Sequence, residues 1–134
     1  MALKLTILHY HLRPAGISTV IRNAQRVIAG RFDIRVLADF GYNGKPARSR
    51  TQFVAEAQAL TKQLPRAGIL HTHNITLGKH PRLAYAVKLL ARETSIRIIY
   101  QVHDFPEDNR PGQLHALRHC AGKRDDKFWR EFCY

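Results

Sequence analysis

The chain has 134 residues, of which 45% are hydrophobic, and its 22 lysines and arginines outnumber its 10 aspartates and glutamates to give a net charge of +12. This length and composition suit one domain with one core, and no apolar run reaches the roughly 18 residues that a membrane span needs. The charge favours anionic partners such as phosphorylated metabolites, anionic lipid headgroups or nucleic acid. Nucleic acid is disfavoured because the basic residues are scattered and no zinc finger, aromatic RNA-binding motif or recognition helix is evident.

Strand-like and helix-like segments alternate along the chain. Residues 3–11 are rich in β-forming side chains, a turn follows at Pro14-Ala15-Gly16, and apolar residues, including Val20 and Val27, then recur at helical spacing as far as Ile28. Further strands are predicted at 33–38, 68–73 and 96–103, with helices between them at 49–64 and 81–93. This alternation predicts an α/β, Rossmann-like, doubly wound parallel sheet with helices on both faces, in which the strands lie in the spatial order second, first, third, fourth.

The loop after the first strand is the first candidate binding site. A dinucleotide fingerprint would need three glycines there, and a P-loop would need a Gly-Lys pair, whereas this loop has only Gly16. The helix that follows still offers free N–H groups, so an anion could bind beside Gly16. The alternative is that Gly16 only forms the turn and Ser18 only caps the helix.

Histidines stand at the ends of three of the four predicted strands: His9 and His11, His71 and His73, and His103, which precedes Asp104. The carboxyl ends of parallel strands share one edge of the sheet, and a spacing of two residues places each pair on one face, so these side chains can converge. The predicted strand order opens a crevice between the first and third strands, with Gly16 and His11 on one side of it. His73 and Asn74 lie on the other side.

Three interpretations of these histidines remain open. Zinc would use the imidazoles as ligands, but no carboxylate or cysteine supplies an obvious fourth position, and we predict no metal. In a polar crevice, a histidine would act as a general base or as a hydrogen-bond donor to a substrate hydroxyl. The third interpretation is a set of hydrogen-bonded edge residues without a ligand. Three histidines lie off the strand ends and are expected on the surface or as helix caps: His80, His115 and His119.

The tail, residues 107–134, differs from the preceding chain. It contains a polar loop, a short predicted helix and an aromatic ending, marked by Leu114, Leu117, Cys120, Phe128, Trp129, Phe132, Cys133 and Tyr134. We expect an irregular or helical tail in which both cysteines are reduced thiols. Because an aromatic segment is poorly suited to a free terminus, we also expect the chain to be the first part of a longer protein.

Three segments together resemble a known family. They are Ile7-Leu8-His9 through Pro14-Ala15-Gly16 with the following helix, then Ile69-Leu70-His71-Thr72-His73-Asn74, and then Val102-His103-Asp104. In this order and spacing they are similar to the N-terminal, acceptor-side domain of family-4-type retaining glycosyltransferases, which have the two-Rossmann-domain (GT-B) architecture. The resemblance covers the chain to about Pro106. It implies one Rossmann-like domain over 1–134 and a C-terminal donor domain that this sequence does not contain.

The resemblance also implies roles for single residues. His103 matches the strand-end histidine that faces the transferred sugar and is the predicted catalytic residue. Gly16 matches a loop glycine that approaches the donor phosphates or sugar, although Ala15 replaces the glycine that often precedes it. We predict that four further residues bind substrate: His11, His73, Asn74 and Asp104.

The implied enzyme is metal-independent and needs no cofactor. Its partners would be a nucleotide-sugar donor, held mainly by the missing domain, and a sugar, polyol or lipid acceptor. The short N-terminal apolar run has no small-residue cleavage site, so we expect a cytoplasmic protein, with an anionic membrane surface among the partners that its charge favours. The chain by itself should be inactive.

A second function class stays open. The chain could be a stand-alone Rossmann-like module that binds an anionic nucleotide or metabolite. Asp39 ends the second strand, where a dinucleotide enzyme places its ribose-binding acid, although an aspartate beside Gly and Asn is also an ordinary turn residue.

Overall fold

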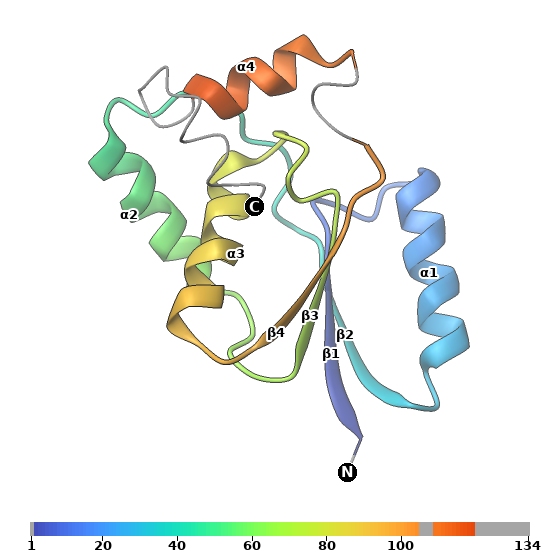
Figure 1. Ribbon diagram of the computed structural model, residues 1–134. Helices are drawn as coiled ribbons and strands as arrows, with labels where there is room; N and C mark the ends of the chain where they lie inside the picture. Colours follow the sequence, from blue (N-terminus) through green and yellow to red (C-terminus); the bar gives the residue numbers. More distant parts are fainter. Residues whose placement is uncertain (1, 105–108, 120–134) are drawn as a thin grey trace.

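The computed structural model of the chain contains one sheet of four parallel strands, in the order β2-β1-β3-β4. It describes residues 2–104 and 109–119 (Figure 1). The elements follow in the order β1 (Leu3–Leu8), α1 (Gly16–Ile28), β2 (Phe32–Leu37), α2 (Arg50–Thr61), β3 (Ile69–His73), α3 (Pro81–Glu93), β4 (Arg97–Gln101) and α4 (Pro111–His119). The predicted α/β class, parallel pairing and strand order are confirmed.

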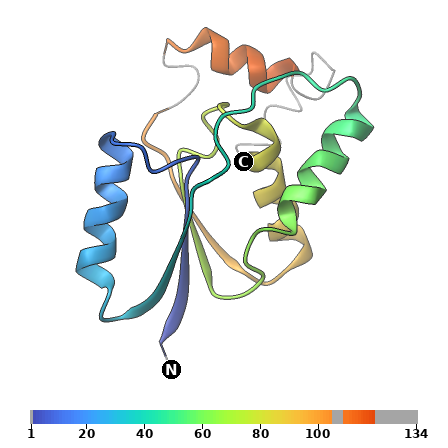
Figure 2. The ribbon, with the colours of Figure 1, turned by 180° about the vertical axis from the view of Figure 1, so that it is seen from behind.

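Helices cover both faces of the sheet, as predicted. Helix α1 packs on one face through Ile21, which joins Leu5 and Ile7 in a buried cluster. Helices α2 and α3 lie on the other face, where Phe53 and Leu83 pack with Leu8 in the larger core (Figures 1 and 2). The two clusters follow from the two-residue periodicity of β1, which directs alternate side chains to opposite faces.

One detail of the predicted packing, the apolar stripe of α1, is wrong. Val20 and Val27 belong to the predicted apolar stripe of α1, yet they are 40% and 80% exposed. Helix α1 packs mainly over β1 and β2. Only a narrow apolar stripe of the helix therefore contacts the sheet.

The connection from β3 to α3 is almost entirely buried and lies beneath α4. A Cβ added to Gly78, whose φ is +87°, would lie 2.6 Å from the Gln113 carbonyl oxygen and 2.8 Å from Leu117. Leu117 itself is buried. Helix α4 therefore packs against the loop that leaves β3, on the side of the sheet where the strands end (Figure 1).

Part of the predicted tail falls outside the described residues. The short helix is present as α4, whereas 105–108 and 120–134, with both cysteines and the terminal aromatic residues, are not described.

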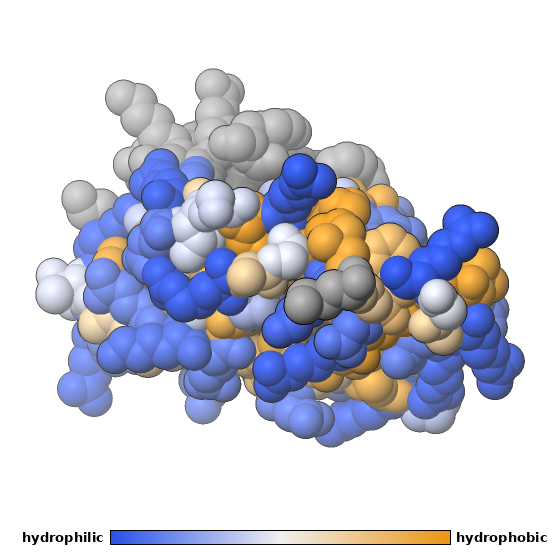
Figure 3. Space-filling model, turned by 90° about the horizontal axis from the view of Figure 1, so that it is seen from below, coloured by the Kyte–Doolittle hydropathy of each residue, from blue (hydrophilic) through white to orange (hydrophobic). Residues whose placement is uncertain are grey.

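Among the described helices, none is long and apolar enough to cross a bilayer. Figure 3 views the molecule from below, where hydrophilic side chains surround an apolar band.

Candidate functional site

Five histidines lie at or near the carboxyl ends of β1, β3 and β4, and we call this group the histidine edge: His9, His11, His71, His73 and His103. The rings of His73 and His103 stack with centroids 5.5 Å apart, although 30 positions separate the two residues in the sequence. The ring of His71 lies 4.5 Å from that of His73. The parallel sheet therefore brings together side chains that the sequence places on different strands.

His73 is the buried centre of the histidine edge. Its Nδ1 lies 3.3 Å from His103 Nε2, and its own Nε2 has no hydrogen-bond partner among the described residues. Burial, reinforced by the neighbouring His71, His103 and His9, lowers the pKa of His73 to about 4. His73 is therefore neutral at pH 7.

The His73 and His103 rings share one proton in their contact, because one of the two nitrogens must donate and the other accept. A buried N–H without an acceptor is rarer in proteins than an under-used acceptor, so the proton of His73 belongs on Nδ1 and its isolated Nε2 is bare. His103 then accepts at Nε2 and carries its own proton on Nδ1. This exposed ring presents an N–H donor to whatever binds at the edge.

The neighbouring histidines are also held as neutral imidazoles. His9 donates from Nδ1 to the His73 carbonyl oxygen at 3.0 Å, and His71 donates from Nε2 to Gln101 Oε1 at 2.8 Å. Burial is the main cause that lowers the pKa of both rings. His9, His71 and His73 are therefore uncharged imidazoles at neutral pH.

Asn74 fastens the end of β4 to the end of β3. Its side-chain oxygen accepts the backbone N–H groups of His103 at 2.6 Å and Asp104 at 3.2 Å, and its amide nitrogen donates to Asp104 Oδ2 at 3.1 Å. Its φ of +52° is a left-handed conformation that asparagine tolerates better than most residues. Asp104 also forms an ion pair with Arg110 at 3.2 Å. These contacts make Asn74 a positioning residue for His103.

Tyr10 supports the same corner from within the core, and sequence reasoning missed it. Its buried hydroxyl lies 2.8 Å from the Asn74 carbonyl oxygen and 3.0 Å from that of Ile75, to which it donates. Burial raises the pKa of the phenol. The available signal was the alternation of the strand end, which directs Tyr10 to the face opposite His9 and His11.

His11 lies on the far side of the histidine edge and contacts the loop after β2. Its Nε2 is 2.7 Å from the Tyr42 hydroxyl, which also receives a hydrogen bond from Lys79 Nζ at 3.3 Å. The Lys79 ammonium stands 4.8 Å from the centroid of the Tyr42 ring. Neither Tyr42 nor Lys79 was singled out in the sequence, because loops lack the periodicity that marks a shared face.

Gly16 begins α1 and stands in open space. A Cβ added to it would meet no atom within 4 Å. Ser18 accepts the Ala15 N–H at 2.9 Å and donates to the Ala15 carbonyl at 2.8 Å, so the predicted capping role of Ser18 is confirmed. The loop therefore leaves room for a ligand beside Gly16.

Asp39 lies outside the histidine edge. Asp39 is exposed and lines an open hollow of about 530 Å³ beside β2, together with Arg35 and Phe40. Among the described residues, no group of three or more His, Cys, Asp or Glu side chains is arranged to hold a metal ion.

Comparisons with known proteins give one similarity. No protein-family model and no solved structure matches the chain. The mannosylglucosyl-3-phosphoglycerate synthase of Petrotoga mobilis is 25% identical over an alignment 131 positions long, and the match covers 77% of this chain and 26% of the synthase. The chain thus spans about a quarter of the length of this curated relative. The similarity supports a relationship to glycosyltransferases.

Proposed function

We propose that the chain is the acceptor-side domain of a retaining glycosyltransferase with the GT-B architecture, of the family-4 type. The observation that carries the proposal is the pair formed by buried His73 and exposed His103 at the carboxyl edge of a parallel sheet. Ligands of open α/β folds bind outside this edge. The similarity to the Petrotoga synthase supports the same function class.

In this proposal, His103 touches the transferred sugar. Its Nδ1–H would donate to a sugar hydroxyl, and His73 would fix the ring and its tautomer from behind. Asn74 would hold the backbone at His103 and Asp104 in place. Such pre-organised donors act when charge develops in the transition state, because they need not reorganise at that moment.

The open surface around the edge leaves room for the remaining proposed partners. Gly16 would let the donor phosphates or sugar approach the N-terminus of α1, whose N–H groups suit an anion. His11 and Asp104 would contact substrate hydroxyls. The donor is a nucleotide-sugar held mainly by a second domain, and the acceptor is a sugar, polyol or lipid. The name of the relative adds a glycosylated phosphoglycerate to the compounds worth testing.

The test is His103→Ala in the protein that carries both domains. We expect turnover to fall by about 100-fold, as for the loss of a donor to developing charge, with an unchanged fold. His115→Ala is the matched control, because His115 is an exposed histidine on α4, outside the histidine edge. Wild-type turnover from a well-folded His103→Ala variant would overturn the proposal.

One observation favours a second candidate, a stand-alone module for an anionic nucleotide or metabolite. Asp39 lines the open hollow beside β2, where it could meet a ribose. Calorimetric titration of the 134-residue chain with nucleotide-sugars separates the two candidates. We expect no micromolar binding from the acceptor-side domain alone. Micromolar binding that is lost in Asp39→Asn would favour the module.

A further inference from the structure

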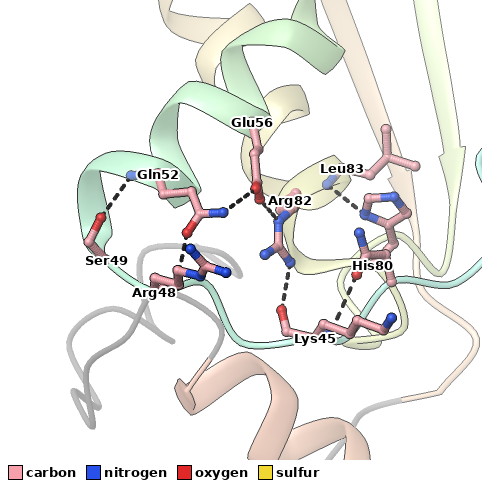
Figure 4. Close-up of polar contacts among 9 residues, drawn as sticks. Lys45, Arg48, Ser49, Gln52, Glu56, His80, Arg82 and Leu83 are labelled. Carbon is pink, nitrogen blue, oxygen red and sulfur yellow. Dashed lines mark hydrogen bonds and ion pairs between the residues drawn. The ribbon is translucent and has the colours of Figure 1, made fainter.

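A second cavity, of about 450 Å³, lies between α2, the start of α3 and the loop that precedes α2; we call it the α2–α3 cavity. Polar side chains dominate its lining: Asn43, Lys45, Gln52, Glu56, His80 and Arg82. Figure 4 shows several of these side chains gathered between the two helices and the loop. None of them belongs to the histidine edge.

Arg82 and Glu56 form the fixed wall of the α2–α3 cavity. The Arg82 side chain is 6% exposed; its Nε pairs with Glu56 Oε2, and its Nη1 donates to the Lys45 carbonyl oxygen at 2.8 Å. Gln52 donates to the other Glu56 oxygen at 2.8 Å (Figure 4). The hydrogen bond from Arg82 is the main cause that lowers the pKa of Glu56, so the two charges balance within the wall.

Lys45 supplies the charge that is left over. Its side chain is exposed, and its ammonium has no partner among the described residues. With Arg82 and Glu56 balanced, the described lining carries one net positive charge. An ammonium in this setting attracts an anion, because the one carboxylate of the described lining is already paired.

His80 adds a neutral donor at the start of α3. Its Nδ1 accepts the Leu83 N–H at 3.2 Å, so the ring proton must lie on Nε2. Nε2 has no hydrogen-bond partner among the described residues. The prediction that His80 caps a helix is confirmed, and the alternative of a surface position is wrong because the residue is buried. No acidic residue stands in the first turn of α3, so the positive end of the helix dipole adds to the attraction.

One loop joins this cavity to the histidine edge. Tyr42, which contacts His11, directly precedes Asn43 in the lining. The Asn43 N–H donates to the Lys79 carbonyl oxygen at 2.9 Å, and Lys79 Nζ reaches back to Tyr42. The two sites therefore share one loop, in which Tyr42 contacts the histidine edge and Asn43 lines the α2–α3 cavity.

We propose that the α2–α3 cavity binds the phosphate group of a phosphorylated polyol acceptor, with Lys45 as its counter-charge. Arg82 and His80 would donate to the phosphate oxygens, and the Asn43 and Gln52 amides would contact the polyol hydroxyls. This inference rests on the proposed function, since it gives the substrate class of the acceptor-side domain. A phosphate group would be attracted by the Lys45 ammonium, whereas a neutral sugar would gain nothing from its charge.

The test measures binding to the 134-residue chain directly by calorimetric titration with glycerol 3-phosphate, inorganic phosphate and glycerol. We expect saturable binding of glycerol 3-phosphate, weaker binding of inorganic phosphate and no binding of glycerol. Lys45→Gln should weaken binding of glycerol 3-phosphate by about tenfold or more, the usual effect of losing a charge-assisted hydrogen bond. Lys62→Gln, an equal loss of charge at an exposed position outside this lining, should change it less than about twofold.

Three outcomes would overturn the inference: no binding of glycerol 3-phosphate, equal losses in Lys45→Gln and Lys62→Gln, or inorganic phosphate binding more tightly than glycerol 3-phosphate. The first two outcomes would show that the cavity holds no phosphate site. The third would show that the polyol group adds no affinity.

A second variant guards against a trivial loss through misfolding. Glu56→Gln removes the carboxylate that competes for Arg82, so glycerol 3-phosphate should bind several-fold more tightly, an effect that unfolding cannot produce. Unchanged or weaker binding with a native circular dichroism spectrum would contradict the inference. The titration and the His103→Ala assay fail separately: loss of phosphate binding leaves a transferase with a neutral acceptor, whereas wild-type turnover in His103→Ala leaves an anion site on a protein of another function.

Discussion

The histidine edge and the α2–α3 cavity lie on either side of one loop, but they are built on opposite electrostatic principles. Burial keeps His9, His71 and His73 neutral, and two of them donate to oxygen atoms of neighbouring residues. The cavity instead keeps its charges, with Arg82 and Glu56 paired and Lys45 open to solvent. The first arrangement suits directional hydrogen bonding to uncharged hydroxyls. The second suits attraction of an anion, which acts over a longer range and is screened by salt.

Acid should destabilise the histidine edge more than any of the substitutions described below. The folded pKa of His73 is about 4 against an ordinary value of 6.5, so between these pH values the unfolded chain binds a proton that the folded chain does not. Stability is therefore fully present above pH 6.5 and falls as the pH drops toward 4, by roughly 3 kcal/mol from this residue. Urea unfolding measured between pH 7 and pH 4 tests this loss of stability. His73→Phe should flatten the pH dependence, and an unchanged slope would show that His73 is not its source.

Substitution of Asn74 tests whether the same edge depends on one backbone anchor. Asn74→Ala removes the acceptor of two N–H groups and places a methyl side chain at φ +52°, so we expect a loss of roughly 2 kcal/mol in unfolding free energy. Asn74→Gly should recover about 1 kcal/mol of this loss, because glycine adopts positive φ without strain. Equal losses for both variants would mean that the left-handed conformation carries no cost.

Removal of the Tyr10 hydroxyl, which supports Asn74 from the core, should cost less unfolding free energy. Tyr10→Phe leaves the buried carbonyl groups of Asn74 and Ile75 without this donor, which should cost about 1 kcal/mol. Tyr42→Phe is the matched control, because its hydroxyl lies at the exposed surface and its loss should stay within about 0.5 kcal/mol. Thermal unfolding of both variants at pH 7.5 makes the comparison, and a larger loss in Tyr42→Phe would reverse the order of the two contacts.

The pH dependence of the Glu56 ion pair should be weaker than that of His73 and should fall in a more acidic range. Because the folded pKa of Glu56 is lowered, its stabilisation is present above the ordinary value of 4.5 and is lost as the pH falls through the folded pKa. Glu56→Gln should therefore be slightly less stable than wild type at pH 6, with the difference closing only below 4.5. Melting temperatures from pH 6 to pH 3.5 would show this. A difference that closed between 6.5 and 4.5 would instead belong to histidine titration.

Much of the histidine edge could be anticipated from strand ends alone. A two-residue spacing within 71–73 and the shared edge of parallel strands predict that His73 and His103 approach each other, as they do. The α2–α3 cavity could not be anticipated in this way. Lys45 lies in a loop without periodicity, and Arg82 and Glu56 sit on different helices whose pairing depends on how α2 and α3 pack.

The order of elements, the parallel pairing and the edge at which the histidines gather follow from the residues in chain order, because alternating β and α patterns with right-handed connections allow few other arrangements. Contacts between distant segments are what bury His73 and leave His103 exposed, make Asn74 an anchor, and leave Lys45 unpaired among the described residues. Periodicity assigns a side chain to a face. Which part of that face is covered, and therefore which pKa values shift, depends on contacts between segments distant in the sequence.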